Sequence, residues 1–338
     1  MLKQNEVTVI MPVFNEEKNI GEAIRSIVKQ DFTGSIEIVI VDGNSTDNTV
    51  ELIKEITLKM PVNRSIKLLT NPLRFIPIGL NIACQNAAHD IIVRLDGHTQ
   101  APSNYVSESL KALKEINFKG AVGGRCDIQA SDSTIMSKAI SIGVSHPLGV
   151  GNALYRTLKD QSETLIDVDT VPFGAFTKEL WKSLGGYDEN LIFDEDYDFN
   201  YRVRTKGYRI VMNSKIVLKY FARKDLAGLW TQYYRYGYWA NKFCLKHQII
   251  PSFRRIIPAA FVLMVILLAL SSVKGLSALM TIYFGTILVI SGSEGIVKKK
   301  SFPLAVCLLP VFPTLHFSYG LGSITSLLTW LKDKVIKS

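Results

Sequence analysis

Carboxylates and other polar side chains gather at four places in this sequence, each close to an apolar run. The densest is the segment 193–198, which reads Phe-Asp-Glu-Asp-Tyr-Asp and places four carboxylates within five positions. Their mutual repulsion should raise the pKa of at least one carboxyl toward the range of a useful general base. A calcium-binding turn or a merely solvated acidic turn explains the same segment about equally well.

Asp96 and His98 lie one residue apart, directly after the apolar run 91–95. Side chains at this spacing point the same way and can share one divalent cation. Aspartate supplies the hard oxygen that suits Mg²⁺ or Mn²⁺, whereas histidine favours transition metals. A cation there would neutralise a departing diphosphate. Taken alone, a tight surface turn explains Asp-Gly-His at least as well.

The other two places are the segment 12–16, which reads Pro-Val-Phe-Asn-Glu, and Asp42. Polar side chains and backbone amides after a first strand could hold a base and ribose, but a turn with a helix cap is the simpler explanation of 12–16. An acidic residue such as Asp42 at the carboxyl edge of a sheet commonly accepts from a ribose hydroxyl. A turn over 42–47 that caps the next helix explains Asp42 nearly as well.

Alternating strands and helices should position these clusters. Apolar runs typical of buried parallel strands cover 7–11, 36–41, 66–69 and 91–95. Helical spacing of apolar residues covers 15–30, 50–56 and 81–88. This alternation predicts an α/β fold with a parallel sheet and right-handed crossovers, whose site lies at the carboxyl ends of the strands.

Composition separates the two ends of the chain. Residues 200–338 hold 20 Lys and Arg against 3 Asp and Glu, whereas residues 1–199 hold 19 against 27. The positive charge lies beside apolar segments, which favours an anionic lipid surface over nucleic acid. No basic region or cleavage site follows Met1, so we expect no signal peptide. The four scattered cysteines predict reduced thiols of a cytosol-facing protein.

The C-terminal third carries the membrane signals, consistent with a mean hydropathy of +0.17. Segment 226–250 combines an apolar face, a basic face and many Trp and Tyr, which predicts an amphipathic interface helix; an ordinary surface helix is the alternative. Segments 256–273 and 276–292 predict a hairpin of two spans whose basic flanks lie on the cytoplasmic side. Segment 302–330, interrupted by prolines, is either one kinked span or a broken re-entrant pair. A third span would place Lys332, Lys334 and Lys337 on the opposite side, against the positive-inside rule.

In this order and spacing, the motifs resemble those of glycosyltransferase family 2. The resemblance covers about residues 6–240 and rests on VIMPVFNEEKNI, IVIVDGNSTDNTVELI, IIVRLDGHT and the segment 171–210. The stretch QYYRYGYWA is similar to the family's Gln-x-x-Arg-aromatic signature. More narrowly, LDGHT, SHPLGVGNALYR and HFSYGLGSI resemble the ExoA-like branch, which extends exopolysaccharides on a polyprenyl-diphosphate lipid.

The resemblance implies a GT-A fold with a mixed, mostly parallel sheet, and it assigns roles by position. Asp196 would be the catalytic base, paired with Glu195. Asp96 and His98 would hold Mn²⁺ or Mg²⁺; most relatives have a second Asp where this chain has His98, which leaves the choice of metal open. The residues that would bind the nucleotide, usually UDP, are Pro12, Val13, Asn15, Glu16, Asp42 and Asp96. The residues that would bind the diphosphate or the acceptor are Gln232, Arg235 and Tyr236.

We therefore expect an inverting hexosyltransferase that moves a sugar from a UDP-sugar to a lipid-linked saccharide. The expected parts are a catalytic domain over 1–224, an interface helix region over 225–255 and a transmembrane region of two or three spans over 256–331. The expected partners are a nucleotide sugar, a polyprenyl-diphosphate-linked saccharide and membrane lipids, without nucleic acid. The expected location is the inner (plasma) membrane, with the catalytic domain facing the cytoplasm. Homo-oligomerisation is left open.

Two other functions fit part of the pattern. A processive polysaccharide synthase would normally carry spans before its catalytic domain, whereas this chain begins at the first strand. An inactive scaffold subunit of a polysaccharide complex would explain His98 as decay of the metal motif. Joint retention of the five key residues argues against decay; they are Asp42, Asp96, Glu195, Asp196 and Arg235.

Overall fold

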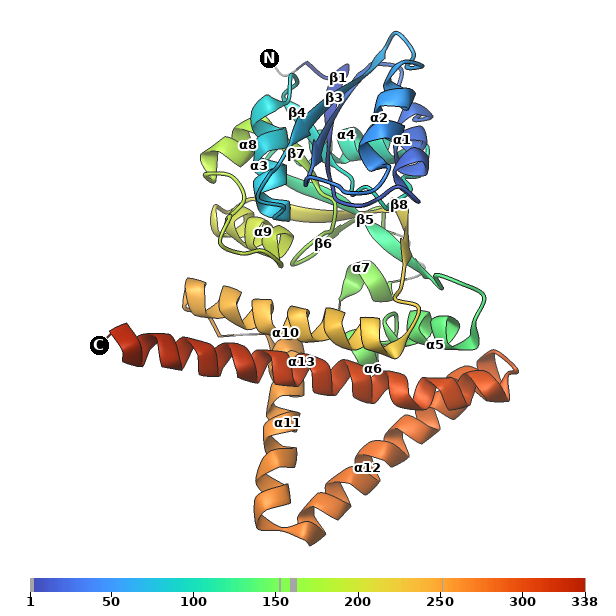
Figure 1. Cartoon of the computed structure of the whole chain (residues 1–338), viewed down its shortest axis with the longest axis vertical. Helices are drawn as coiled ribbons and strands as arrows, with labels where there is room; N and C mark the ends of the chain where they lie inside the picture. The colour runs from blue at the N-terminus through green and yellow to red at the C-terminus, as the bar shows by residue number, and fades with distance from the viewer. Residues whose placement is uncertain (1–2, 152, 159–162, 251, 338) are drawn as a thin grey trace. The chain divides into compact units, whose positions relative to one another are not determined.

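The computed structural model describes residues 3–151, 153–158, 163–250 and 252–337, and its chain divides into two compact units (Figure 1). The first unit comprises residues 1–127 and 158–220, and the second comprises 128–157 and 221–338. Segment 128–157 thus belongs with the C-terminal part of the chain. The functional boundaries expected at residues 224 and 255 stay predictions.

An eight-stranded sheet in the order β3-β2-β1-β4-β7-β5-β8-β6 forms the centre of the first unit. β1 pairs in parallel with β2 and β4, and β2 pairs in parallel with β3. β7 runs antiparallel to β4 and β5, and β6 runs antiparallel to β8. The predicted mixed, mostly parallel sheet is therefore confirmed. The strands are β1 Glu6–Val13, β2 Ser35–Asp42, β3 Arg64–Thr70, β4 Ile91–Arg94, β5 Gly120–Gln129, β6 Leu165–Asp167, β7 Ala175–Thr177 and β8 Arg209–Phe221.

Helix α1 of the first unit buries apolar residues spaced at one helical turn. In α1 the buried residues are Ile20, Ala23, Ile24 and Ile27, and burying each large aliphatic side chain contributes roughly 1.5–3 kcal/mol. α1 begins at Ile20 instead of Asn15, because Asn15 has a φ of 54° and residues 16–19 form a turn. The helices are α1 Ile20–Val28, α2 Thr49–Thr57, α3 Ile76–Asn86, α4 Tyr105–Glu115, α8 Lys178–Ser183 and α9 Glu195–Thr205.

The second unit is built mainly from helices around an apolar core of its own, to which α5, α10 and α13 contribute. α13 is continuous through Pro310 and Pro313, so of the two predicted alternatives for this segment the single helix is the observed one. The helices are α5 Ile135–Gly143, α6 Pro147–Val150, α7 Leu154–Thr157, α10 Leu226–His247, α11 Phe253–Ser271, α12 Val273–Gly292, the π-helical η1 Ser293–Lys298 and α13 Phe302–Lys337.

α13 lies against α10 in direct backbone contact (Figure 1). A Cβ at Gly237 would lie 2.0 Å from the Tyr319 carbonyl oxygen, and a Cβ at Gly322 would lie 2.1 Å from that of Tyr234. Small residues at such crossings let two helices approach more closely than any side chain would allow. α10 and α13 therefore form one paired element.

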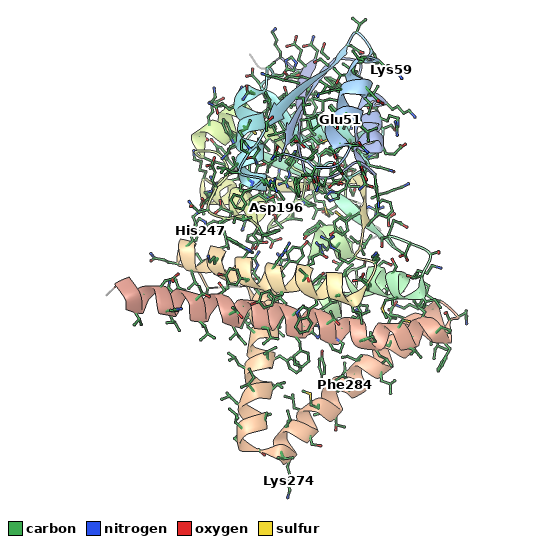
Figure 2. The ribbon with its side chains drawn as sticks, viewed as in Figure 1. Glu51, Lys59, Asp196, His247, Lys274 and Phe284 are labelled. Carbon is green, nitrogen blue, oxygen red and sulfur yellow. The ribbon has the colours of Figure 1, made fainter. Side chains whose placement is uncertain are left out.

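Among the residues that the structure describes, three helical segments are long and apolar enough to cross a membrane, judged by length and composition: 253–271, 273–298 and 302–335. In the first two, only 6% of the apolar stretch is buried inside the protein, whereas in the third the share is 44%. α11 and α12 form the expected hairpin, with Lys274 at its tip (Figure 2). The apolar surface of this hairpin is thus exposed to its surroundings, while α13 is partly covered by protein.

Candidate active site

Polar loops at the carboxyl ends of β1 and β2 are tied to one another. Asp42 ends β2 and accepts hydrogen bonds from the Ser45 amide (3.0 Å) and the Ser45 hydroxyl (2.5 Å). The same hydroxyl oxygen accepts from the Asn15 amide (2.9 Å), and the Asn15 side-chain oxygen accepts from the Thr46 amide (2.8 Å). The structure therefore brings Asn15 and Asp42 together. Asp42 is buried, and its contacts with Ser45 hold this turn in place.

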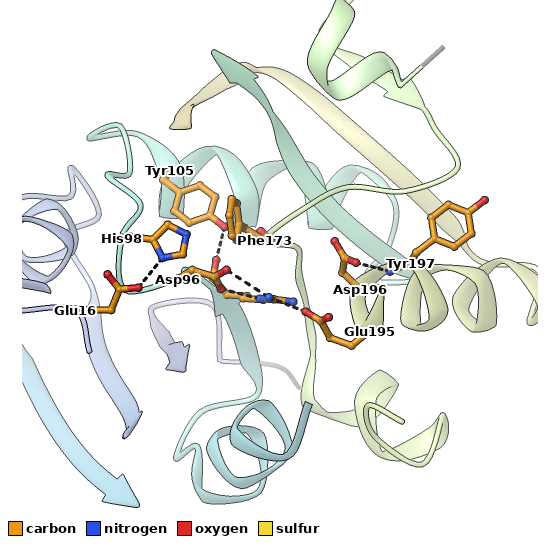
Figure 3. Close-up of polar contacts among 9 residues, drawn as sticks. Glu16, Asp96, His98, Tyr105, Phe173, Glu195, Asp196 and Tyr197 are labelled. Atoms are coloured by element: carbon orange, nitrogen blue, oxygen red, sulfur yellow. Dashed lines mark hydrogen bonds and ion pairs between the residues drawn. The ribbon is translucent and has the colours of Figure 1, made fainter. Parts of the chain in front are cut away.

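The Asp96–His98 turn, after β4, packs against the end of β1. A Cβ at Gly97 would lie 2.8 Å from Val13 Cγ1 and 3.3 Å from Glu16 Cγ, so this close approach requires glycine. His98 Nδ1 lies 2.8 Å from Glu16 Oε1 (Figure 3). Pro12 precedes Val13 on β1, opposite Val41 of β2. The three strand ends thus gather all the residues predicted to hold the nucleotide.

Arg94, the last residue of β4, joins this turn to α9. Its Nε donates to Asp96 Oδ1 (3.1 Å) and its Nη2 lies 2.9 Å from Glu195 Oε1. The Arg94 side chain is only 6% exposed, and its Nη1 is buried with no hydrogen-bond partner within the part of the chain that the structure describes. Tyr105 Oη, 2.6 Å from the Arg94 carbonyl oxygen and 2.5 Å from that of Phe173, fixes the local backbone.

Sequence reasoning assigned no role to Arg94. The sequence does contain an indication that Arg94 has a role, because it is a charged residue within the otherwise apolar run Ile91–Leu95. A charge that is buried with such a run needs a partner. The partners that it finds are Asp96, two residues away, and Glu195, about one hundred residues later.

Three of the four carboxylates of segment 193–198 have distinct surroundings in α9. Burial raises the pKa of Glu195 to about 7; Arg94 opposes this shift and Asp196 adds to it. A raised pKa in this segment was expected, but burial is its largest cause and charge repulsion a lesser one. Asp198 is fully buried and accepts from Arg202 Nε at 2.7 Å, so it stabilises the helix.

Asp196 is half-buried in the first turn of α9, and its Oδ1 accepts from the Tyr197 amide at 2.7 Å. Figure 3 shows Asp196 and Glu195 leaving the start of α9 in different directions. Asp194 just before them has a left-handed φ of 62°, a conformation that is uncommon outside glycine and is often found at functional sites. The start of α9 therefore presents one carboxylate to Arg94 and keeps the other separate from it.

Asp96 and His98 contact different partners, Arg94 and Glu16. Within the described ranges, no group of three His, Cys, Asp or Glu side chains is arranged to hold a metal ion. Magnesium-type ions in nucleotide enzymes are usually held by one or two carboxylates together with substrate phosphates and water. Asp96 and His98, with the Glu16 carboxylate beside His98, fit such a sparse donor set.

Gln232, Arg235 and Tyr236 lie on α10 in the second unit. Gln232 Nε2 donates to Tyr236 Oη (3.0 Å), and Arg235 is exposed. Arg156 of α7 joins this group: it donates to Tyr233 Oη (3.2 Å), and its guanidinium lies 5.9 Å from the centroid of the Tyr236 ring. Sequence reasoning missed Arg156, although the stretch SHPLGVGNALYR contains it. The roles predicted for the three α10 residues stay predictions.

Comparison with known proteins shows the family and the fold of this chain. The model of the family "Glycosyl transferase family 2" matches residues 8–181, just over half of the chain. The succinoglycan biosynthesis protein ExoA of Rhizobium meliloti is 28% identical over 260 residues, which cover 75% of this chain and 74% of that protein. A dolichyl N-acetyl-α-D-glucosaminyl phosphate 3-β-D-2,3-diacetamido-2,3-dideoxy-β-D-glucuronosyltransferase of Methanococcus voltae is 28% identical over 240 residues, covering 69% of this chain and 72% of that enzyme.

Among solved structures, the mannosyltransferase PcManGT of Pyrobaculum calidifontis, in complex with GDP-mannose and Mn²⁺, superposes with a TM-score of 0.59 at 20% identity. The match covers 95% of this chain and 86% of that one. At this identity the likeness speaks to the fold, and it confirms the predicted GT-A architecture.

Proposed function

Because the chain belongs to glycosyltransferase family 2 and is a glycosyltransferase, we propose that it transfers a sugar from a nucleotide-diphosphate sugar to a lipid-linked saccharide. In this proposal the donor is a UDP-sugar in the simplest case, and the transfer inverts the configuration of the anomeric carbon. The observation that carries the proposal is the junction at Arg94. There the loops after β1, β2 and β4, which suit a nucleotide, are joined by a buried ion pair to the start of α9, which carries Asp196.

Asp196 is the general base of this proposal. An acceptor hydroxyl attacks the anomeric carbon from the face opposite the nucleotide, its proton passes to the Asp196 carboxylate, and the bond between that carbon and the diphosphate oxygen breaks. Proton transfer to a positioned base contributes typically about 10²- to 10⁴-fold in rate. Glu195 is the supporting member of the pair, because its contact with Arg94 holds the first turn of α9 in place.

The nucleotide is held in this proposal by the loops around Asn15, Glu16 and Asp42. Asp96 and His98 are the residues that would hold a divalent cation, Mn²⁺ or Mg²⁺, which would supply charge neutralisation for the departing diphosphate. Arg94 keeps the Asp96 carboxylate in a fixed orientation through its 3.1 Å contact. Such preorganisation of charged groups accounts for much of enzymatic rate enhancement.

We further propose that α11 and α12 cross the inner membrane and that α13 remains beside α10 at the cytoplasmic interface. Helices of 19 and 20 residues extend about 28–30 Å, the thickness of a bilayer's hydrocarbon core. The close packing of α13 on α10, and the larger buried share of α13, support this arrangement. It places Lys274, at the tip of the hairpin, on the far side, and it removes the conflict over the C-terminal lysines. The basic residues that it places together on the cytoplasmic side are Arg254, Arg255, Lys298, Lys299, Lys300, Lys332, Lys334 and Lys337.

The test is transfer by the purified full-length protein in lipid nanodiscs, with a panel of UDP- and GDP-sugars and polyprenyl-diphosphate-linked saccharides. We expect addition of a single sugar, and NMR of the product should show the anomeric configuration opposite to that of the donor. A product with the donor's configuration would overturn the single displacement. A polymer ladder from one donor would identify a processive synthase, and nucleotide binding without transfer to any acceptor would identify a scaffold subunit.

A further inference from the structure

The second unit contains an apolar groove of about 720 Å³ between α10, α12 and α13. Figure 2 marks Phe284, which with Leu288 forms the α12 wall of the groove. Thr314 contributes the sole hydroxyl among the lining side chains, and that hydroxyl donates to the Pro310 carbonyl (2.8 Å). The full lining is Trp230, Phe284, Leu288, Leu309, Pro310, Pro313, Thr314 and Phe317.

We propose that this groove binds the polyprenyl chain of the lipid-linked acceptor. The inference rests on the proposed function for the existence of such an acceptor, and it assigns the acceptor's hydrocarbon part to a specific place. Two of the three walls, α12 and α13, belong to segments apolar enough to lie in a bilayer, so a lipid chain can enter the groove from the side without crossing water.

The shape of the lining favours a branched, stiff chain. Lipid tails are as apolar as the groove, so hydrophobic transfer alone does not drive a chain into it, and van der Waals packing must discriminate. Three aromatic rings and two proline rings line the groove, and flat, rigid surfaces of this kind suit the methyl branches and planar double bonds of isoprene units. They suit the freely rotating tail of an ordinary phospholipid less well.

Arg156 of α7, which contacts α10, is the residue that we assign to the anionic end of the same lipid. Trp230 of the groove and Tyr233 are three residues apart on α10, hence neighbours on its surface. Tyr233 Oη accepts from Arg156, which also lies over the rings of Tyr155 and Tyr236. Arginine is well suited to bind phosphate through its planar set of donors.

Charge supports an anionic lipid over other occupants of the groove. The second unit holds 16 Lys and Arg against 4 Asp and Glu. A neutral apolar peptide or a second copy of this basic unit would bring no compensating negative charge. A polyprenyl phosphate or diphosphate brings both the hydrocarbon chain and the anion.

The experiment is photolabelling of the full-length protein in nanodiscs with a polyprenyl phosphate that carries a diazirine on its chain. A phosphatidylglycerol with a diazirine on its acyl chain serves as the bulk-lipid probe. We expect the polyprenyl probe to label α12 and α13 peptides around the groove. Excess unlabelled polyprenyl phosphate should suppress this labelling, and excess phosphatidylglycerol should not.

The Leu288→Trp variant fills the groove with a larger side chain. Its matched control is Leu267→Trp on α11, because Leu267 does not line the groove and the exposed fractions of Leu288 and Leu267 are 62% and 64%. Leu288→Trp should reduce polyprenyl labelling about tenfold, the loss expected when roughly ten carbon–carbon contacts disappear. The control should label like the wild type. Arg156→Gln should weaken labelling by the polyprenyl phosphate and leave labelling by the corresponding polyprenol unchanged.

Labelling of α11 by the polyprenyl probe to the same extent as the groove would overturn the proposal. So would suppression of the groove signal by phosphatidylglycerol, which would identify ordinary lipid as the occupant. Mapping in the wild-type protein does not depend on how any variant folds. Because labelling requires no sugar transfer, a labelled groove without transfer would count against the proposed function alone, and transfer with an unlabelled groove would count against this inference alone.

Discussion

Replacing Arg94 with methionine should destabilise the first unit more than any loss of a surface ion pair. Methionine keeps most of the length and apolar volume of the side chain and removes the charge. Two carboxylates then lose their cation: Asp96, whose side chain is 17% exposed, and Glu195, whose side chain is 8% exposed. Removing one partner from a buried ion pair typically costs about 3–5 kcal/mol, because the remaining charge is uncompensated. For a unit of this size, that corresponds to a fall in Tm of roughly 6–20 °C.

The loss of stability in the Arg94→Met variant should depend on pH in a defined direction. In the wild type, burial raises the pKa of Glu195 to about 7, above its ordinary value of 4.5. A carboxyl with a raised folded-state pKa binds more protons when folded, so its contribution to stability is present at low pH and is lost as pH rises toward 7. Arg94 lowers this pKa, so its removal should raise the pKa of Glu195 further. The gap between variant and wild type should therefore be smaller near pH 6, where the loss of the Asp96 contact remains, and should widen up to about pH 8.5.

Thermal denaturation in detergent, followed by intrinsic fluorescence at both pH values, measures this effect. Arg209→Met is the matched control: Arg209 and Asp167 are 2.7 Å apart, but their side chains are 50% and 65% exposed, so its loss should cost at most about 1 kcal/mol. The double variant Arg94→Met, Glu195→Gln should recover part of the loss, since the buried charge is then absent. If Arg94→Met and Arg209→Met had equal effects at about pH 8.5, the buried ion pair would not contribute as argued.

Three further predictions concern the metal and the membrane. Excess chelator should abolish transfer, and Mn²⁺ should restore it at least as well as Mg²⁺ because His98 is a borderline-soft ligand; full activity in chelator would exclude the site at Asp96 and His98. His98→Asp should shift the preference toward Mg²⁺, measured as the ratio of rates with the two ions, while His89→Asn should leave that ratio unchanged. Full-length protein should stay in the membrane pellet at high salt and leave it only with detergent, because membrane-spanning segments hold a protein in the bilayer far more strongly than surface charges do. Release by salt alone would show that α11 and α12 do not span the membrane.

Local patterns predicted the elements that surround the nucleotide loops. Apolar runs located β1, β2 and β4, because a buried parallel strand needs a nearly continuous apolar sequence. The shorter run 66–69 located β3, which lies at the edge of the sheet and is less buried. Helical spacing located α1 and α2, although α1 begins several residues later than predicted. The left-handed Asn15 and the turn after it delay the helix.

The contacts that complete the site join residues far apart in sequence, and no local pattern encodes them. Glu16 meets His98, and Arg94 meets Glu195, only because the sheet places their strands and helix side by side. For the same reason, segment 128–157 could not be assigned to the second unit: α5 contributes Ile140 to a core whose other members include Phe312 of α13.

The prolines of α13 show the limit of a local rule in another way. Pro310 and Pro313 indicated a kink or a break, since each removes a backbone donor. The helix nevertheless continues, with the Thr314 hydroxyl donating to the Pro310 carbonyl and with neighbouring helices packed around it. Tertiary packing thus overrides the local preference against a helix at these positions.

Asp196→Asn is the variant that isolates the proposed base, because Asp196 lies on α9 and the predicted nucleotide contacts lie on other elements. Nucleotide affinity of the full-length variant, measured by calorimetry with UDP and Mn²⁺, should match the wild type, because the predicted nucleotide contacts lie on the loops after β1, β2 and β4. Transfer under the same conditions should fall by about 10²-fold or more, with Asp90→Asn, an exposed aspartate of the same unit, unchanged. Equal UDP affinity combined with near-normal transfer by Asp196→Asn would show that Asp196 is not the base.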